Sequence, residues 1–162
     1  MRKINLIIIH CSATPPSMDY SPKKMWNDHV NANGWESWGY HWYIRRTGEV
    51  IALRPEEEAG AHCKGFNNHS IGICYEGGVS DSPSFREIRL DDGTIRTVKY
   101  RAPEDNRTAE QKLAMHRLVQ DIIGRYPITA IKGHRDLIRY GSKSCPCFDV
   151  NSEFHRYISE DS

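Results

Sequence analysis

Residues 4–12 read INLIIIHCS, and this stretch decides the fold. Residues 4–9 are dominated by isoleucine, whose branched side chain fits a β-strand. They also lack the regular polar alternation of a strand with one face in water. A continuous apolar run of this kind predicts a strand buried on both faces, as in the parallel sheets of α/β proteins. His10 would then lie at the carboxyl end of that strand.

The rest of the chain supplies neighbours for this strand. Ser21 and Pro22 are typical of a helix N-terminus. Thr108 and Gln111 have the spacing of a capping box and precede a helical apolar stripe. We expect further strands over residues 41–46, 50–53, 70–76 and 128–131, and helices over residues 21–34, 108–126 and 149–158. These elements predict the α/β class, with one central mixed β-sheet flanked by helices.

Residues 79–106 differ from their surroundings because they are polar and charged. Asp92 and Gly93 form a turn signal between two half-apolar arms. We expect a peripheral hairpin or long loop here, and we expect it to border the functional groove because it follows the 70–76 strand directly.

The bulk composition limits the function. The 162 residues are 38% hydrophobic, so residues 1–162 fit a single domain. The net charge of +1, without a basic run, argues against nucleic acid as a partner. The longest apolar run is too short for a membrane segment and lacks the flanks of a signal peptide. We therefore expect synthesis in the cytoplasm. We also expect a monomer.

Two histidines and a cysteine lie where a sheet would bring them together. His10 and His134 each come at the end of a predicted strand, and side chains beyond the carboxyl ends of parallel strands converge on one crevice. With Cys145 they would provide three zinc ligands and leave a fourth position for water, which is the pattern of a catalytic site. Spacing alone leaves open that either histidine is purely structural.

Several ordered motifs carry a more specific resemblance. They read IIIHCSAT (7–14), GYHWYIRRTGEV (39–50), GAHCKGFNNHSIGICYEGG (60–78), GHRD (133–136) and KSCPCFD (143–149). In this order they resemble the type 2 zinc N-acetylmuramoyl-L-alanine amidases, the family of bacteriophage lysozyme amidases and peptidoglycan recognition proteins. The resemblance implies one Zn²⁺ per chain and hydrolysis of the amide that joins N-acetylmuramic acid to L-alanine in peptidoglycan.

The resemblance also assigns roles to individual residues. It places the zinc ligands at His10, His134 and Cys145. It places Tyr40 and Lys143 over the metal-bound water and the scissile carbonyl, where a phenol and an ammonium can stabilise a developing oxyanion.

The sequence allows two interpretations of His62 and Asn67. His62 and Asn67 match a family segment that lines the muropeptide groove, so they are candidate substrate-binding residues. The alternative is a polar turn that leads into the strand over residues 70–76.

Other functions remain to be weighed against the amidase. One is a cell-wall peptidase with Cys145 as nucleophile and a histidine as base. This is disfavoured because Cys145 precedes a proline and does not open a helix that would lower its pKa. Another is a recognition module that binds peptidoglycan or muropeptide without cutting it, although such members of the family typically lack the cysteine ligand.

The biological setting has alternatives as well. We expect a bacteriolytic phage or prophage endolysin that acts on the cell wall after release, in peptidoglycan catabolism. A recycling enzyme and an exported toxin are the other settings. Some phage members of this family also bind an RNA polymerase. The motifs quoted above carry no information on such binding.

Overall fold

The computed structural model describes residues 1–138 and 144–158. Strand β1 (Leu6–Cys11) lies inside a five-stranded sheet of order β3-β2-β4-β1-β7, and all of its residues are buried. It pairs in parallel with β4 (Ser70–Tyr75) on one side and with β7 (Ala130–Gly133) on the other. The apolar run at the N-terminus thus forms the strand buried on both faces that its composition predicts.

At the β3 edge the sheet contains an antiparallel pair, so the sheet as a whole is mixed. Strand β2 (Trp42–Ile44) pairs in parallel with β4 and antiparallel with β3 (Val50–Ala52). Strand β7 begins two residues later than expected, because the N–H groups of Ile128 and Thr129 bond to carbonyls outside the strand ladder. The predicted α/β class with a central mixed sheet is confirmed.

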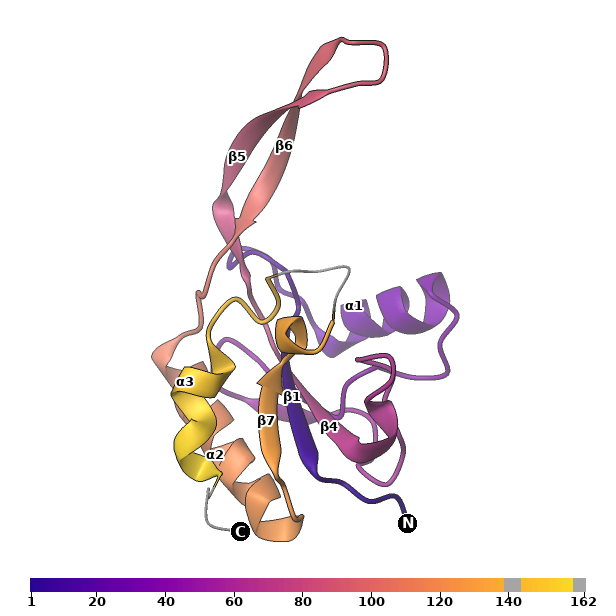
Figure 1. The fold of residues 1–162 in the computed structure, drawn as a ribbon, viewed down its shortest axis with the longest axis vertical. Helices are drawn as coiled ribbons and strands as arrows, with labels where there is room; N and C mark the ends of the chain where they lie inside the picture. The colour runs from indigo at the N-terminus through magenta and orange to yellow at the C-terminus, as the bar shows by residue number, and fades with distance from the viewer. Residues whose placement is uncertain (139–143, 159–162) are drawn as a thin grey trace.

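One face of the sheet is covered by the two C-terminal helices, α2 (Ala109–Arg125) and α3 (Val150–Phe154) (Figure 1). The capping box predicted for α2 is present, with Thr108 and Gln111 bonded to each other's backbone N–H groups. Helix α3 is shorter than expected and continues as the 3₁₀ turn His155–Tyr157. The largest group of buried apolar side chains lies between these helices and the sheet.

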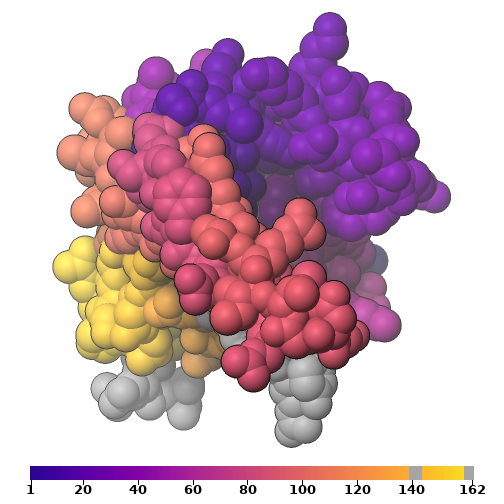
Figure 2. Space-filling model, turned by 90° about the horizontal axis from the view of Figure 1, so that it is seen from above, coloured from indigo at the N-terminus to yellow at the C-terminus, as the bar shows by residue number. Residues whose placement is uncertain are grey.

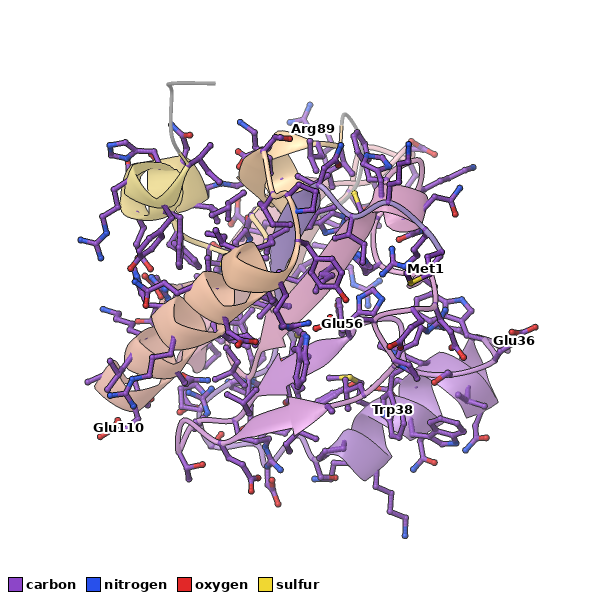
Figure 3. All side chains as sticks on the ribbon, turned by 90° about the horizontal axis from the view of Figure 1, so that it is seen from below. Met1, Glu36, Trp38, Glu56, Arg89 and Glu110 are labelled. Atoms are coloured by element: carbon purple, nitrogen blue, oxygen red, sulfur yellow. The ribbon has the colours of Figure 1, made fainter. Side chains whose placement is uncertain are left out.

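Helix α1 lies on the opposite face of the sheet (Figure 3). Ser21 caps this helix as predicted, but α1 covers only Pro22–Trp26 and continues as a π-helical segment, Asn27–Ala32. Two short 3₁₀ turns, Asn67–His69 and His134–Asp136, adjoin β4 and β7.

A two-stranded arm projects from the end of the sheet at which β1 and β7 terminate (Figure 1). It consists of β5 (Val79–Arg89) and β6 (Ile95–Pro103), which pair antiparallel with each other and form a sheet of their own. Gly93 takes a positive φ of 86° in the connecting turn, a conformation that favours glycine. Among the described residues, no helix is long and apolar enough to cross a membrane.

Candidate metal centre and active site

His10 faces away from the main core because side chains alternate along β1. Ile7 and Ile9 pack in the cluster beneath α2, whereas Leu6 and Ile8 belong to a separate cluster on the other face. His10 shares the parity of Leu6 and Ile8, so its imidazole lies on the face opposite α2. The side chain is almost fully buried there, with 1% of its surface exposed.

His134 and Cys145 reach the same point from later segments. His134 directly follows β7, whose last N–H, that of Gly133, donates to the carboxylate of Asp136 at 2.8 Å. The backbone N–H of Arg135 donates to the carbonyl of Cys145 at 2.8 Å, which joins the two segments. The thiol sulfur of Cys145 in turn accepts the backbone N–H of Cys11 at 3.2 Å.

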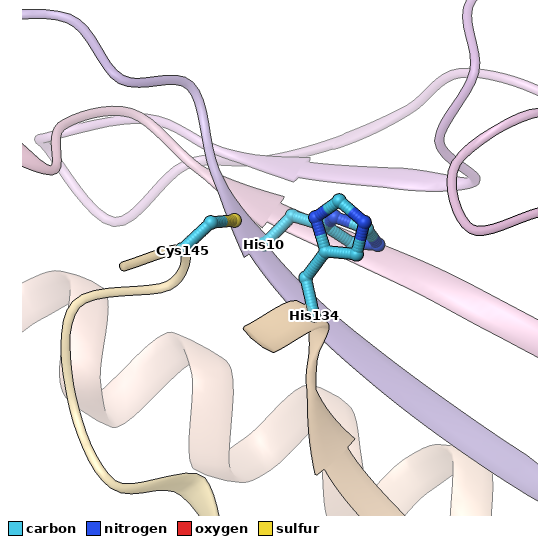
Figure 4. Close-up of side chains that lie close together, drawn as sticks. All are labelled: His10, His134 and Cys145. Atoms are coloured by element: carbon cyan, nitrogen blue, oxygen red, sulfur yellow. The ribbon is translucent and has the colours of Figure 1, made fainter. Parts of the chain in front are cut away.

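These three side chains converge, as Figure 4 shows. One ligand atom from each of His10, His134 and Cys145 lies within 4.8 Å of the other two. Tetrahedral zinc has Zn–N bonds of about 2.0 Å and Zn–S bonds of about 2.3 Å, so its ligand atoms lie roughly 3 to 4 Å apart. Two imidazoles and a thiolate at this separation fit a zinc ion after small side-chain adjustments.

The protonation of the two histidines suits a metal. Burial, reinforced by the neighbouring imidazoles, lowers the pKa of His10 well below its usual value of 6.5. Burial also lowers the pKa of His134. Both rings are therefore neutral at neutral pH, and the neutral imidazole is the form that binds metal.

Tyr40 lies beside this cluster. Its ring centroid is 4.9 Å from that of His10, and the ring is half-buried. Removal from water raises the pKa of its hydroxyl well above 10, so the phenol keeps its proton and can donate it in a hydrogen bond. Lys143, the other residue expected over the metal, lies outside the described residues.

His62 lies behind His10. Its Nδ1 is 2.8 Å from Nε2 of His10, and its Nε2 is 3.3 Å from the hydroxyl of Ser70. Only 9% of the residue is exposed. The ring is thus held between a candidate ligand and strand β4, and nothing in the local sequence signals this contact.

Asn67 organises the loop that carries His62. Its Oδ1 accepts the backbone N–H groups of His62 and Cys63, each at 3.0 Å. Both His62 and Asn67 also line a surface cavity of about 370 Å³, together with Trp35 and Lys64. Their role in substrate binding stays a prediction.

On one face of this α/β sheet, a thiol and two neutral imidazoles lie beside a protonated phenol. This arrangement defines a candidate hydrolytic metal centre. The comparisons with known proteins agree with this class. The family model for N-acetylmuramoyl-L-alanine amidase matches residues 1–148, so the chain belongs to that family.

Phage proteins are among the similar sequences. The endolysin of Enterobacteria phage K11 is 33% identical over 142 residues, which is 88% of this chain and 80% of that protein. The endolysin of Escherichia phage T7 is 31% identical over 144 residues, with 89% of this chain and 81% of that protein covered.

Solved structures share the fold. The amidase LysC from Clostridium intestinale superposes with a TM-score of 0.70 at 24% identity, covering 98% of this chain and 88% of LysC. The Drosophila peptidoglycan recognition protein PGRP-LB has a TM-score of 0.68 at 20% identity, covering 100% of this chain and 86% of that one. The fold predicted from the family resemblance is thereby confirmed.

Proposed function

We propose that this protein hydrolyses the amide bond between N-acetylmuramic acid and L-alanine of the peptidoglycan stem peptide. The observation that carries the proposal is the convergence of His10, His134 and Cys145 in a chain of the N-acetylmuramoyl-L-alanine amidase family. Membership of the family supports the reaction, and the donor set supports a metal-dependent route for it.

The three side chains would hold one Zn²⁺. Bound there, zinc would supply an activated water and polarise the scissile carbonyl. The backbone N–H of Cys11, which donates to the sulfur of Cys145, stabilises the thiolate that a metal needs. His62 would orient the His10 ring through the bond at Nε2, which leaves Nδ1 for the metal.

Tyr40 and Lys143 would act on the substrate. The protonated hydroxyl of Tyr40 would donate a hydrogen bond to the oxygen that gains charge as the carbonyl becomes tetrahedral. A donor of this kind is typically worth about 3 kcal/mol in the transition state. Lys143 would add a positive charge at the same oxygen.

The substrate would enter along the cavity lined by His62 and Asn67. Oδ1 of Asn67 is already occupied by two backbone N–H groups, so its amide nitrogen is the group left for a muropeptide. Because both ring nitrogens of His62 have partners, His62 would contact the substrate only through its ring edge.

The setting we propose is that of a phage or prophage endolysin, because the K11 and T7 relatives carry that name. Residues 1–162 would form a single amidase domain that is monomeric and acts on the cell wall after its release.

Metal content and amide cleavage measured together test the proposal. We expect about one zinc per wild-type chain, with a new L-alanine amino terminus released from muropeptide. Cys145→Ala should lose both the zinc and the activity. Tyr40→Phe and Lys143→Ala should keep the zinc and lose on the order of a hundredfold in kcat.

Other outcomes would select a rival function. A metal-free wild type that is active and is inactivated by alkylation would make Cys145 the nucleophile of a peptidase. Zinc-loaded protein that binds muropeptide without cutting it would be a recognition module.

A further inference from the structure

The β5–β6 arm, residues 79–103, carries apolar side chains that the fold leaves in water. Phe85, Leu90, Ile95 and Tyr100 are 64%, 39%, 59% and 38% exposed. A two-stranded hairpin without a third strand is marginally stable in water by itself. Phe85 and Ile95 lie on one face of the arm and Tyr100 on the other, so each face offers an apolar side chain to a partner.

The arm also carries more positive than negative charge along its paired strands. It holds five basic residues, Arg86, Arg89, Arg96, Lys99 and Arg101, and four acidic ones, Asp81, Glu87, Asp91 and Asp92. Three of the acids lie away from the paired region, because Asp91 and Asp92 occupy the turn and Asp81 bonds to Ser17 at the root.

None of the five basic residues of the arm belongs to an ion pair among the described residues. Within the paired residues 83–89 and 95–101, Glu87 is the one residue of negative charge. The arm therefore offers unpaired cations to an anionic partner.

Cations and apolar groups alternate on both faces of the arm. Phe85 lies directly opposite Lys99, and Arg89 directly opposite Ile95, so these pairs share a face. On the other face, the guanidinium of Arg86 lies 5.5 Å from the ring centroid of Tyr100. Aromatic rings can stack on sugar rings, while guanidinium groups bind carboxylates in bidentate fashion.

The root of the arm touches the segment that carries Cys145. The thiol of Cys147 donates to the carbonyl of Gly78 at 3.2 Å, and Gly78 directly precedes β5. Figure 2 looks down the arm and shows it standing over the body of the protein between the N-terminal and C-terminal segments. A polymer held along the arm would therefore pass close to the candidate metal centre.

We propose that the arm is a second binding surface for polymeric peptidoglycan, which holds a glycan strand and its anionic stem peptides next to the strand being cut. This inference rests on the proposed function, whose substrate it specifies as the polymer. A second copy of the chain fits less well, because the arms would bring like charges together. A membrane fits less well because Asp91 and Asp92 at the tip would enter an anionic surface first.

The test compares two triple charge reversals. One is Arg86→Glu, Arg89→Glu and Lys99→Glu on the arm. The matched control makes the same change in net charge at exposed positions on the helical side of the sheet, opposite the candidate metal centre. It consists of Lys112→Glu, Arg117→Glu and Arg156→Glu. Binding to insoluble sacculi is measured in the cold by sedimentation, and cleavage is measured on both sacculi and soluble muropeptide.

We expect the arm variant to bind sacculi at least about tenfold more weakly than the control variant, because a second point of attachment multiplies affinity. Cleavage of sacculi should fall with it. Cleavage of soluble muropeptide should stay within about twofold of wild type, since that substrate does not span both surfaces. This last measurement also shows that the variant is folded.

Three results would overturn the inference. In the first, the arm variant binds sacculi as tightly as the control. In the second, the arm variant loses binding to vesicles of anionic phospholipid and keeps binding to sacculi. In the third, wild type is a dimer that the arm variant dissociates. Failure of the proposed amidase function would look different, because wild type would then leave soluble muropeptide uncut while the sacculus-binding comparison remained readable.

Discussion

At the level of the residue, His62 connects the candidate metal centre to the sheet. It bridges Nε2 of His10 and the hydroxyl of Ser70. A partner on the remote nitrogen of a metal-binding histidine fixes the orientation of the ring. We therefore expect His62 to orient His10, in addition to the substrate binding that its sequence motif suggests.

Replacing His62 tests this role. His62→Ala should weaken zinc binding about 10- to 100-fold because the His10 ring loses its orienting partner. Competition for zinc against a chromophoric chelator gives the affinity directly. His155→Ala is the matched control, because His155 is exposed and its Nδ1 bonds to the main-chain carbonyls of Asn151 and Ser152. Equal zinc affinity in the two variants would exclude the orienting role.

His41 shows how burial makes a single residue sensitive to pH. Its Nδ1 accepts the N–H of Gly72, and its Nε2 lies 2.8 Å from the carbonyl of Glu58. Burial lowers its pKa from 6.5 to about 4, although the bond to Glu58 opposes this effect. The unfolded chain therefore takes up the proton first as the pH falls.

The stabilisation that neutral His41 provides is complete above pH 6.5 and is lost as the pH falls toward 4. It amounts to at most about 3 kcal/mol. Urea unfolding at about pH 7.5 and about pH 5 measures the loss. His41→Asn should show a smaller loss than wild type between these two conditions, and an equal loss would refute the assignment.

At the level of the element, a partly buried ion pair holds the C-terminus of helix α2 to Glu56, which lies in the turn after β3. Arg125 donates to both carboxylate oxygens of Glu56, at 2.6 and 2.8 Å, and Tyr126 and Trp42 donate to the same group. Burial acts to raise the pKa of Glu56, but these hydrogen bonds outweigh it and bring the pKa to about 2.

Removing the charge of Glu56 should loosen this end of α2. We expect Glu56→Gln to lower the free energy of unfolding by about 2 kcal/mol, less than for a fully buried pair because the Arg125 side chain is 40% exposed. Asp121 is also paired with Arg125, but its side chain is 61% exposed, so Asp121→Asn, which removes the negative charge, should cost under about 0.5 kcal/mol. Chemical denaturation at neutral pH compares the two, and similar losses would contradict the role of burial.

At the level of the whole molecule, the candidate metal centre joins segments that are far apart in the chain. His10 lies near the N-terminus, whereas His134 and Cys145 follow the last strand. A metal that binds only the folded arrangement stabilises the entire fold by mass action.

Zinc should therefore raise the thermal stability of the protein. At a free zinc concentration about a thousandfold above Kd, the gain is about 4 kcal/mol. Chelation should then lower Tm by roughly 10 °C for a chain of this size. Differential scanning calorimetry with and without chelator measures this, and Cys145→Ala should show no such difference. A Tm that chelation leaves unchanged in wild type would argue against the zinc site.

The sequence by itself determined the parts of this protein that depend on neighbours along the chain. The isoleucine run of β1, the Ser21 cap of α1 and the capping box of α2 are local patterns, and each forms as its chemistry predicts. The ordered motifs also identified the family, because several of them together are far more specific than any single one.

Only the tertiary structure decided which side chains meet. The bond between His10 and His62 joins residues that are 52 apart, and it exists because the register of β1 against β4 brings that face of the sheet to the 61–69 loop. The isolation of the arm depends likewise on the absence, within residues 1–138 and 144–158, of a third strand that pairs with β5 or β6. Hydrophobic periodicity specifies which face of an element is buried, but the contacts between elements depend on how the whole chain packs, and no local pattern carries that information.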